Sequence, residues 1–330
     1  MNGREQDAGR SEGRGVRPGG PGGVAAVLCI LALATVGSGT PRPAELRTCV
    51  VALRMTSSVE IASDPKPSRP EAVAVDHHGR VLIADTGNNR VLVLSSEGDA
   101  VGEFGGYGWQ AGRFDAPTDI SLHEGFYIYV LDEGNRRVQR FDVRGDFVDV
   151  AIEEGDAGTP VGIEVGQAGE LLIVDDDRQA ILTYSQFDEV TEAIGRFGQD
   201  LGGLVRPADV AVGPSREIAV ADPGRGVVAV FDEFGSPLRS LAFGDSLEPD
   251  DVLFDPTGCL FAADAENGLV LAFPPRGQGP TAVLGRGDVD REFAPSGMAF
   301  SPDGSLIVLD RDGGRILTVA IEHGECPRSE

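Results

Sequence analysis

The stretch PEAVAVDHHGRVLIAD, Pro70 to Asp85, holds two short apolar runs that flank a turn at Gly79. The same pattern recurs five more times in the 330 residues of the chain. Proline and aspartate are 15 residues apart in all six copies, whereas successive prolines are 42 to 47 residues apart. The length variation therefore falls in the connections between units. The prolines are Pro70, Pro117, Pro160, Pro207, Pro249 and Pro295, and the aspartates are Asp85, Asp132, Asp175, Asp222, Asp264 and Asp310.

Each copy continues with a third apolar run, such as RVLVL at 90–94, and most copies have a weaker fourth run. Four short strands in each repeat of this length are typical of a β-propeller blade. A helical repeat would need apolar residues at spacings of three and four over longer runs, and a membrane barrel would need longer alternating strands. The sequence therefore predicts an all-β fold, a six-bladed β-propeller of four-stranded blades.

The sixth copy ends without a fourth run, and the segment CVVALRMTSSVEIA, Cys49 to Ala62, has strand character without a repeat of its own. We expect this N-terminal strand to complete the last blade and to close the ring, which leaves no large unpaired edge. That arrangement places Cys49 near Cys326, and a disulfide between them would lock the seam. The alternative is two unrelated thiols near the chain ends.

The N-terminus differs from the repeats in composition. Residues 1–23 are rich in Gly, Arg and Pro, and residues 24–36 are 13 residues without a charge. This run is short for a bilayer span and is typical of a secretory signal, with an uncleaved anchor over 24–37 as the alternative. We expect residues 1–39 to direct export to the periplasm, cell surface or medium, 40–48 to be a linker, and 49–330 to form a monomeric propeller that meets a membrane only through the N-terminal segment.

The chain is strongly acidic, with 28 Lys and Arg residues against 53 Asp and Glu residues and a net charge of −25. A nucleic-acid-binding surface needs a basic patch, so this balance argues against nucleic acid as a partner. It is compatible with cation binding and with basic partners.

The first copy, from Pro70 through ADTGNNR at 84–90, resembles an NHL repeat, and LDEGNRRVQRF at 131–141 is similar to it. Copies three to five keep the aspartate and lack the Asn-Asn-Arg triplet. The resemblance covers about residues 50–325 and implies a six-bladed NHL-type propeller. Its members include lyases, receptor ectodomains and RNA-binding proteins, so it does not imply an activity.

The recurring aspartates are interpreted as structural turn residues, because Asp accepts hydrogen bonds from nearby backbone N–H groups and Gly and Asn tolerate positive φ. Arg90, Arg137 and Arg315, five residues later, are expected to pair with them. The acidic run 175–177 is interpreted as a solvated turn. His77, His78 and His123 fall in turns at the opposite end of the blades. They therefore do not support the histidine-held metal of NHL-type amidating lyases.

The copies differ two residues after each proline, where the inner strand is expected to reach the mouth of the central channel. Asp119, Asp209 and Asp251 occupy three of these positions, and Glu71 and Asp250 lie one position earlier in their copies. Three like charges in a ring would repel one another unless a hard cation such as Ca²⁺ screens them. The alternative is that these carboxylates accept hydrogen bonds from strand backbone. Tyr107 and Trp109, in the Gly-rich connection after the first copy, are further binding candidates, unless they pack that loop down.

Motifs for a nucleophilic serine, a zinc protease, a paired-cysteine site and a phosphate-binding loop are absent from the sequence. We therefore expect a non-catalytic binding or scaffold module for a protein, peptide or glycan, without a required cofactor. The alternative is a lactonase- or lyase-like enzyme with Ca²⁺ or another divalent cation held by Asp119, Asp209 and Asp251.

Overall fold

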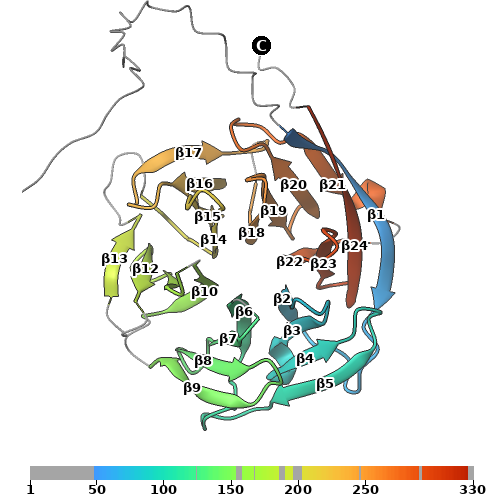
Figure 1. The fold of residues 1–330 in the computed structure, drawn as a ribbon, viewed down its shortest axis with the longest axis vertical. Coiled ribbons are helices and arrows are strands. Elements are labelled where there is room, and N and C mark those ends of the chain that lie inside the picture. Colours follow the sequence, from blue (N-terminus) through green and yellow to red (C-terminus); the bar gives the residue numbers. More distant parts are fainter. Residues whose placement is uncertain are drawn as a thin grey trace, which may run out of the picture. The chain divides into compact units, whose positions relative to one another are not determined.

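A computed structural model describes residues 48–123, 125–153, 158–166, 168–185, 190–195, 203–244, 247–289 and 292–325. Their strands form six antiparallel four-stranded sheets arranged as a ring (Figure 1). The predicted six-bladed β-propeller is therefore confirmed. The predicted N-terminal segment 1–39, all but the last residue of the linker, and Cys326 lie outside the described residues. Within the described part of the chain, no helix is long and apolar enough to cross a membrane.

The first three blades contain β2 to β13, and each blade runs from its inner strand to its outer strand in sequence order. Their bounds are β2 Pro70–Val75, β3 Val81–Asp85, β4 Arg90–Leu94, β5 Ala100–Gly105; β6 Pro117–His123, β7 Tyr127–Asp132, β8 Arg137–Asp142, β9 Phe147–Ile152; β10 Pro160–Val165, β11 Leu171–Asp175, β12 Ala180–Tyr184 and β13 Val190–Ile194. A 3₁₀ turn, η1, spans Thr86–Asn88.

The last three blades contain β14 to β24 and are completed by β1. Their bounds are β14 Asp209–Val212, β15 Ile218–Asp222, β16 Val227–Phe231, β17 Pro237–Leu241; β18 Asp251–Phe254, β19 Leu260–Asp264, β20 Leu269–Phe273, β21 Ala282–Gly285; β22 Pro295–Phe300, β23 Leu306–Asp310, β24 Arg315–Glu325 and β1 Thr48–Glu60. A second 3₁₀ turn, η2, spans Arg286–Asp288.

The hydrophobic core lies between neighbouring blades. Every residue of five of the six second strands is buried, and in β7 only Tyr127 is exposed. Between blades 1 and 2, for example, Leu82 and Val91 pack in one cluster with Val130 and Phe141. Strands covered on both sides favour dense Val, Ile and Leu, which explains why the second strand of each repeat has no polar face.

The ring is closed by the N-terminal strand, as predicted. β1 pairs antiparallel with β24, from Thr48 opposite Glu325 to Glu60 opposite Arg315, and Cys49 lies opposite Gly324. Cys49 is disulfide-bonded, and Cys259 keeps its thiol and is not the partner. Because Cys326 lies outside the described residues, the Cys49–Cys326 pairing stays a prediction.

The six recurring aspartates end the six second strands, and all are 0% exposed. Each carboxylate accepts a backbone N–H, at 2.7 to 3.4 Å, from the connection that enters its own blade. Arg90, Arg137 and Arg315 donate their Nε–H to the same carboxylates at 2.7 to 2.8 Å. The aspartate therefore ties the second strand both to the following turn and to the preceding connection. The six donors are Ser68, Asp115, Thr159, Val205, Glu248 and Ala294.

Candidate functional site

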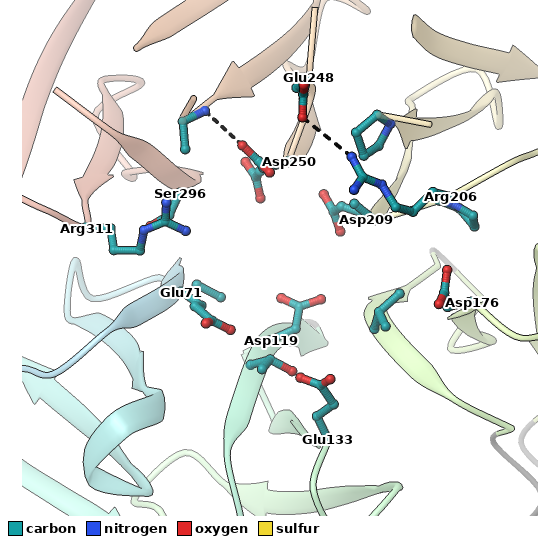
Figure 2. A pocket seen from close by; sticks show the side chains of 18 of the residues that line it. Glu71, Asp119, Glu133, Asp176, Arg206, Asp209, Glu248, Asp250, Ser296 and Arg311 are labelled. Atoms are coloured by element: carbon teal, nitrogen blue, oxygen red, sulfur yellow. Dashed lines mark hydrogen bonds and ion pairs between the residues drawn. The ribbon is translucent and has the colours of Figure 1, made fainter. Parts of the chain in front are cut away.

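A cavity of about 510 Å³ opens at the end of the ring that carries the inter-blade connections (Figure 2). All six blades contribute to its wall, and nine of its lining residues are acidic against two arginines. We call it the acidic cup. The acidic residues are Glu71, Asp119, Glu133, Asp176, Asp209, Glu248, Asp250, Asp251 and Glu266, and the arginines are Arg206 and Arg311. Arg206 reaches Glu248 at 3.5 Å, which leaves most of the acidic charge without a basic counterpart in the wall.

The floor of the acidic cup is a ring of six positions, each two residues after a blade proline, which we call the neck. Its members are Ala72, Asp119, Gly162, Asp209, Asp251 and Gly297. Below the neck, the space between the inner strands continues as a second cavity of about 210 Å³, the inner channel. Ala72, Asp119, Asp209 and Asp251 line both cavities, so these residues mark where the two meet.

The neck carboxylates link the inner strands of successive blades. Oδ2 of Asp119 accepts the N–H of Ile163 at 2.7 Å, and Oδ2 of Asp209 accepts the N–H of Val252 at 2.8 Å. The backbone N–H of Met298 donates to Asp251 in the same manner. These contacts explain why aspartate recurs at this phase without requiring a bound cation.

Glycine occupies the neck where neighbouring blades approach more closely. A Cβ added at Gly162 would lie 2.8 Å from the carbonyl oxygen of Ala208. At Gly297 it would lie 3.0 Å from the backbone nitrogen of Val73. These separations leave no room for a carboxylate, so aspartate and glycine are two different solutions to the same blade contact.

Burial is the main cause that raises the pKa values of the neck carboxylates. It raises the pKa of Asp119 to about 6, although the N–H groups of Ile163 and Ile120 act in the opposite direction. Burial and then the charge of Asp119 raise the pKa of Asp209 well above its usual range. For Asp251, burial and then the charges of Asp209 and Asp119 raise the pKa in the same way. The neck therefore holds protons that an exposed carboxylate would release.

One residue of the channel was not identified from the sequence. Glu164 in β10 lines the inner channel, and Ser121 Oγ donates to its Oε2 at 2.9 Å. Burial, followed by the charge of Asp119, raises the pKa of Glu164 to about 7. The sequence feature that could have identified Glu164 is its position four residues after the blade proline, where the other five copies have Ala, Ser or Leu.

The geometry does not place the predicted cation ligands close enough together to hold a metal ion. Among the residues that the structure describes, no group of three or more His, Cys, Asp or Glu side chains could hold a metal ion together. Asp119, Asp209 and Asp251 share the neck but come from three blades. The Ca²⁺ site stays a prediction.

The aromatic connection between blades 1 and 2 is held rigidly and presents its aromatic pair to solvent. Trp109 is 75% exposed and Tyr107 is 74% exposed, whereas Phe114 is fully buried and anchors the connection. Gly112 N–H donates to Gln139 Oε1 at 2.8 Å, which fixes the loop to blade 2. Neither aromatic ring is needed to pack the loop down, because Phe114 does so.

The histidines lie outside both cavities, since none is among the residues that line the acidic cup or the inner channel. The rings of His77 and His78 contact each other in the turn after β2, with centroids 3.8 Å apart and planes tilted by 44°. His323 belongs to β24, and its Nε2 lies 3.2 Å from Oδ2 of Asp255, which follows β18. Histidine chemistry is therefore not available in the channel.

The NHL repeat model matches residues 68–94, the segment that contains the first three strands of blade 1, β2 to β4. The chain is a six-bladed β-propeller that contains an NHL repeat. E3 ubiquitin-protein ligase NHLRC1 of Homo sapiens is 24% identical over 266 residues, which cover 74% of this chain and 65% of that protein. The Rattus norvegicus protein of the same name is 23% identical over 273 residues, with the same shares covered. This NHL-repeat chain thus spans about 65% of the length of the curated relatives it matches.

Two similar solved structures have the same kind of fold as this NHL-repeat propeller. A streptogramin B lyase structure has a TM-score of 0.59 at 12% identity and covers 81% of this chain and 98% of its own. A catalytically inactive histidine-to-alanine variant of virginiamycin B lyase from Staphylococcus aureus, with quinupristin, has a TM-score of 0.57 at 11% identity, covering 80% of this chain and 98% of its own. At this identity the likeness concerns the fold alone.

Proposed function

We propose that this NHL-repeat propeller is a non-catalytic binding module, and that its acidic cup binds a positively charged segment of a protein or peptide. The observation that carries the proposal is the charge of the cup, whose wall has nine acidic side chains and two arginines. Burial raises the pKa values of Glu71, Glu133 and Asp250 as well as those of the neck. A cationic ligand would favour the ionised carboxylates, so the face is better suited to a basic ligand than to a neutral glycan.

The exposed aromatic pair extends this binding face. Asn135 Nδ2 donates to the carbonyl oxygen of Gly108, between Tyr107 and Trp109, and Asn135 belongs to the same turn as the cup residue Glu133. Aromatic side chains held on a rigid loop lose little conformational entropy on binding and are frequent hot spots. We therefore place Tyr107 and Trp109 at the edge of the partner contact, where a Lys or Arg of the partner could also stack on Trp109.

The test compares two doubly neutralised variants in quantitative pull-downs from an extract of the source organism. Glu133→Gln with Glu266→Gln removes charge from the acidic cup, and Glu97→Gln with Asp146→Asn removes the same charge from turns at the opposite end of the ring. Proteins that bind the cup should be captured by the parent and the second variant and depleted at least tenfold with the first. Equal capture by both variants would contradict the proposal. Salt-sensitive capture of RNA would indicate RNA as the partner in place of a protein or peptide.

A metal-dependent enzyme is the alternative function. The observation that favours an enzyme is the presence of three carboxylates in the neck. The position of the histidines outside both cavities argues against it. The named lyase variant in which a histidine is replaced by alanine is catalytically inactive, whereas none of the histidines of this chain lines the acidic cup or the inner channel. Metal analysis and a Ca²⁺ titration of the melting temperature decide between the two, because a shift that Asp209→Asn abolishes would support the enzyme.

The relatives are named E3 ubiquitin-protein ligases, and we propose no ubiquitin chemistry for this chain, which matches 65% of the length of the human relative. We propose export of the propeller as a monomer, with residues 24–37 as signal or anchor. The disulfide at Cys49 supports an oxidising compartment. Fractionation of cells that express the full chain tests this, and a reduced, cytosolic product would contradict it.

A further inference from the structure

One acceptor in the neck has no donor. Oδ2 of Asp251 is buried and has no hydrogen-bond partner in the structure, whereas the Oδ2 atoms of Asp119 and Asp209 each accept a backbone N–H. A buried polar atom in this state is less favourable than one that has a hydrogen-bond partner. A donor that reaches Asp251 Oδ2 would therefore bind more favourably than the same donor at an exposed carboxylate.

The residue that carries this acceptor borders both cavities. Asp251 lines the acidic cup and the inner channel, as do Asp119 and Asp209, so a narrow group at the neck would lie among all three residues. Asp251 Oδ2 itself is enclosed, so a donor must enter the neck to meet it. The three come from β18, β6 and β14, and they therefore approach such a group from different sides of the ring. A single positive charge between them would screen their mutual repulsion.

We propose that the neck binds one primary ammonium group, at the end of a lysine side chain or at a chain terminus of the partner. This inference rests on the proposed function, because the group is carried into the neck by a ligand of the acidic cup. An ammonium is a compact charge with three divergent N–H donors, which matches acceptors that belong to three separate strands.

A guanidinium group matches the neck less well. Arginine prefers a two-pronged contact in which both oxygens of one carboxylate accept parallel N–H bonds. Each neck carboxylate already accepts a backbone N–H from the next blade. The donors are Ile163 for Asp119, Val252 for Asp209 and Met298 for Asp251. No divalent ion is invoked, because the described residues include no group that could hold a metal.

The test uses isothermal titration of the full chain with four short probes. They are acetyl-Gly-Lys-Gly-amide, its Nε-acetyl form, acetyl-Gly-Arg-Gly-amide, and Gly-Gly-Gly-amide with a free amino terminus. The lysine peptide should bind at least tenfold more tightly than its Nε-acetyl form and at least threefold more tightly than the arginine peptide. Tight binding of Gly-Gly-Gly-amide would support the ammonium site and assign it to a chain terminus. Equal affinity of the lysine peptide and its Nε-acetyl form would overturn the proposal.

A matched pair of variants locates the site. Asp251→Asn removes the charge and keeps an oxygen for the Met298 N–H, and it should weaken the lysine peptide at least tenfold. Asp146→Asn, at an exposed turn at the opposite end of the ring, should change its affinity less than threefold. If lysine and arginine peptides bind alike and Asp251→Asn weakens neither, the neck proposal fails and binding by the acidic cup stands. If Asp251→Asn does not fold, the four probes on the parent chain still decide.

Discussion

Replacing Glu164 with glutamine should make the protein more stable at pH 8 and leave it unchanged at pH 4.5. The carboxyl group is held in the inner channel against β6, where Ser121 donates to it and Asp119 is the nearest charge that acts on its pKa. A glutamine has the same size and can still accept from Ser121, but its amide nitrogen cannot accept a backbone N–H, and Val212 and Val165 donate to Glu164 as well. The loss of the charge is the main change, and the gain at pH 8 should fall somewhat below the full cost of ionisation.

The magnitude follows from the pKa of Glu164, which burial raises from 4.5 to about 7. The folded protein therefore binds this proton more tightly than the unfolded chain does, and the free energy of unfolding falls as the pH rises from about 4.5 to about 7. At about 1.4 kcal/mol for each pH unit, the ionised side chain costs about 3 kcal/mol at pH 8. Below pH 4.5 both states are protonated and the cost disappears.

Urea denaturation of the parent and of Glu164→Gln at the two pH values measures this difference. The variant should gain about 2–3 kcal/mol at pH 8 and less than about 0.5 kcal/mol at pH 4.5. Glu153→Gln, at an exposed glutamate after β9, controls for the general effect of removing one charge from an acidic chain. An equal gain at both pH values, or no gain at pH 8, would refute the reasoning.

Three further substitutions test the blade contacts and the binding face. Asp85→Ala should lower the free energy of unfolding by about 3–5 kcal/mol in guanidinium titrations, because it removes a buried carboxylate that accepts from Ser68, Asn88 and Arg90 and leaves the buried Arg90 with Glu103 as its remaining acidic partner; an unchanged midpoint would contradict this. Gly297→Ala should cost about 1–3 kcal/mol, since its Cβ would press on the next blade, whereas Gly102→Ala, where the Cβ meets open space, should cost less than about 0.5 kcal/mol. Equal costs would show that the contact relaxes freely. Trp109→Ala should leave the melting temperature within about 1–2 °C and weaken capture of the partner, because the ring is 75% exposed.

The fold could be predicted because the repeat is redundant. The constant spacing from Pro70 to Asp85 and its five counterparts set the phase of every strand, and β3 and the other second strands end at the predicted aspartates. The missing fourth run of the last copy indicated ring closure by the N-terminal strand, which the pairing of β1 with β24 confirms. These inferences needed only the local sequence pattern of each repeat and the number of apolar runs in it.

The site could be predicted only in part, because its properties depend on contacts between blades. The neck positions followed from the phase, but the hydrogen bond from Ile163 to Asp119 joins residues 44 positions apart, and no local pattern indicates it. The exposure of Trp109 depends on Phe114, which fills the place that the tryptophan might have taken. Glu164 was recognisable only as the odd acid at its phase, and its pKa depends on burial that the sequence does not show.

The acidic face is tested most directly by counting the protons released when a cation binds. Titration of acetyl-Gly-Lys-Gly-amide at pH 6.5, in two buffers with different ionisation enthalpies, measures that number. Because burial raises the pKa of Asp119 to about 6 and those of Asp209 and Asp251 well above their usual range, a bound ammonium should drive ionisation of these groups and release protons. Binding with the same enthalpy in both buffers, or with proton uptake, would contradict a cation site at the neck.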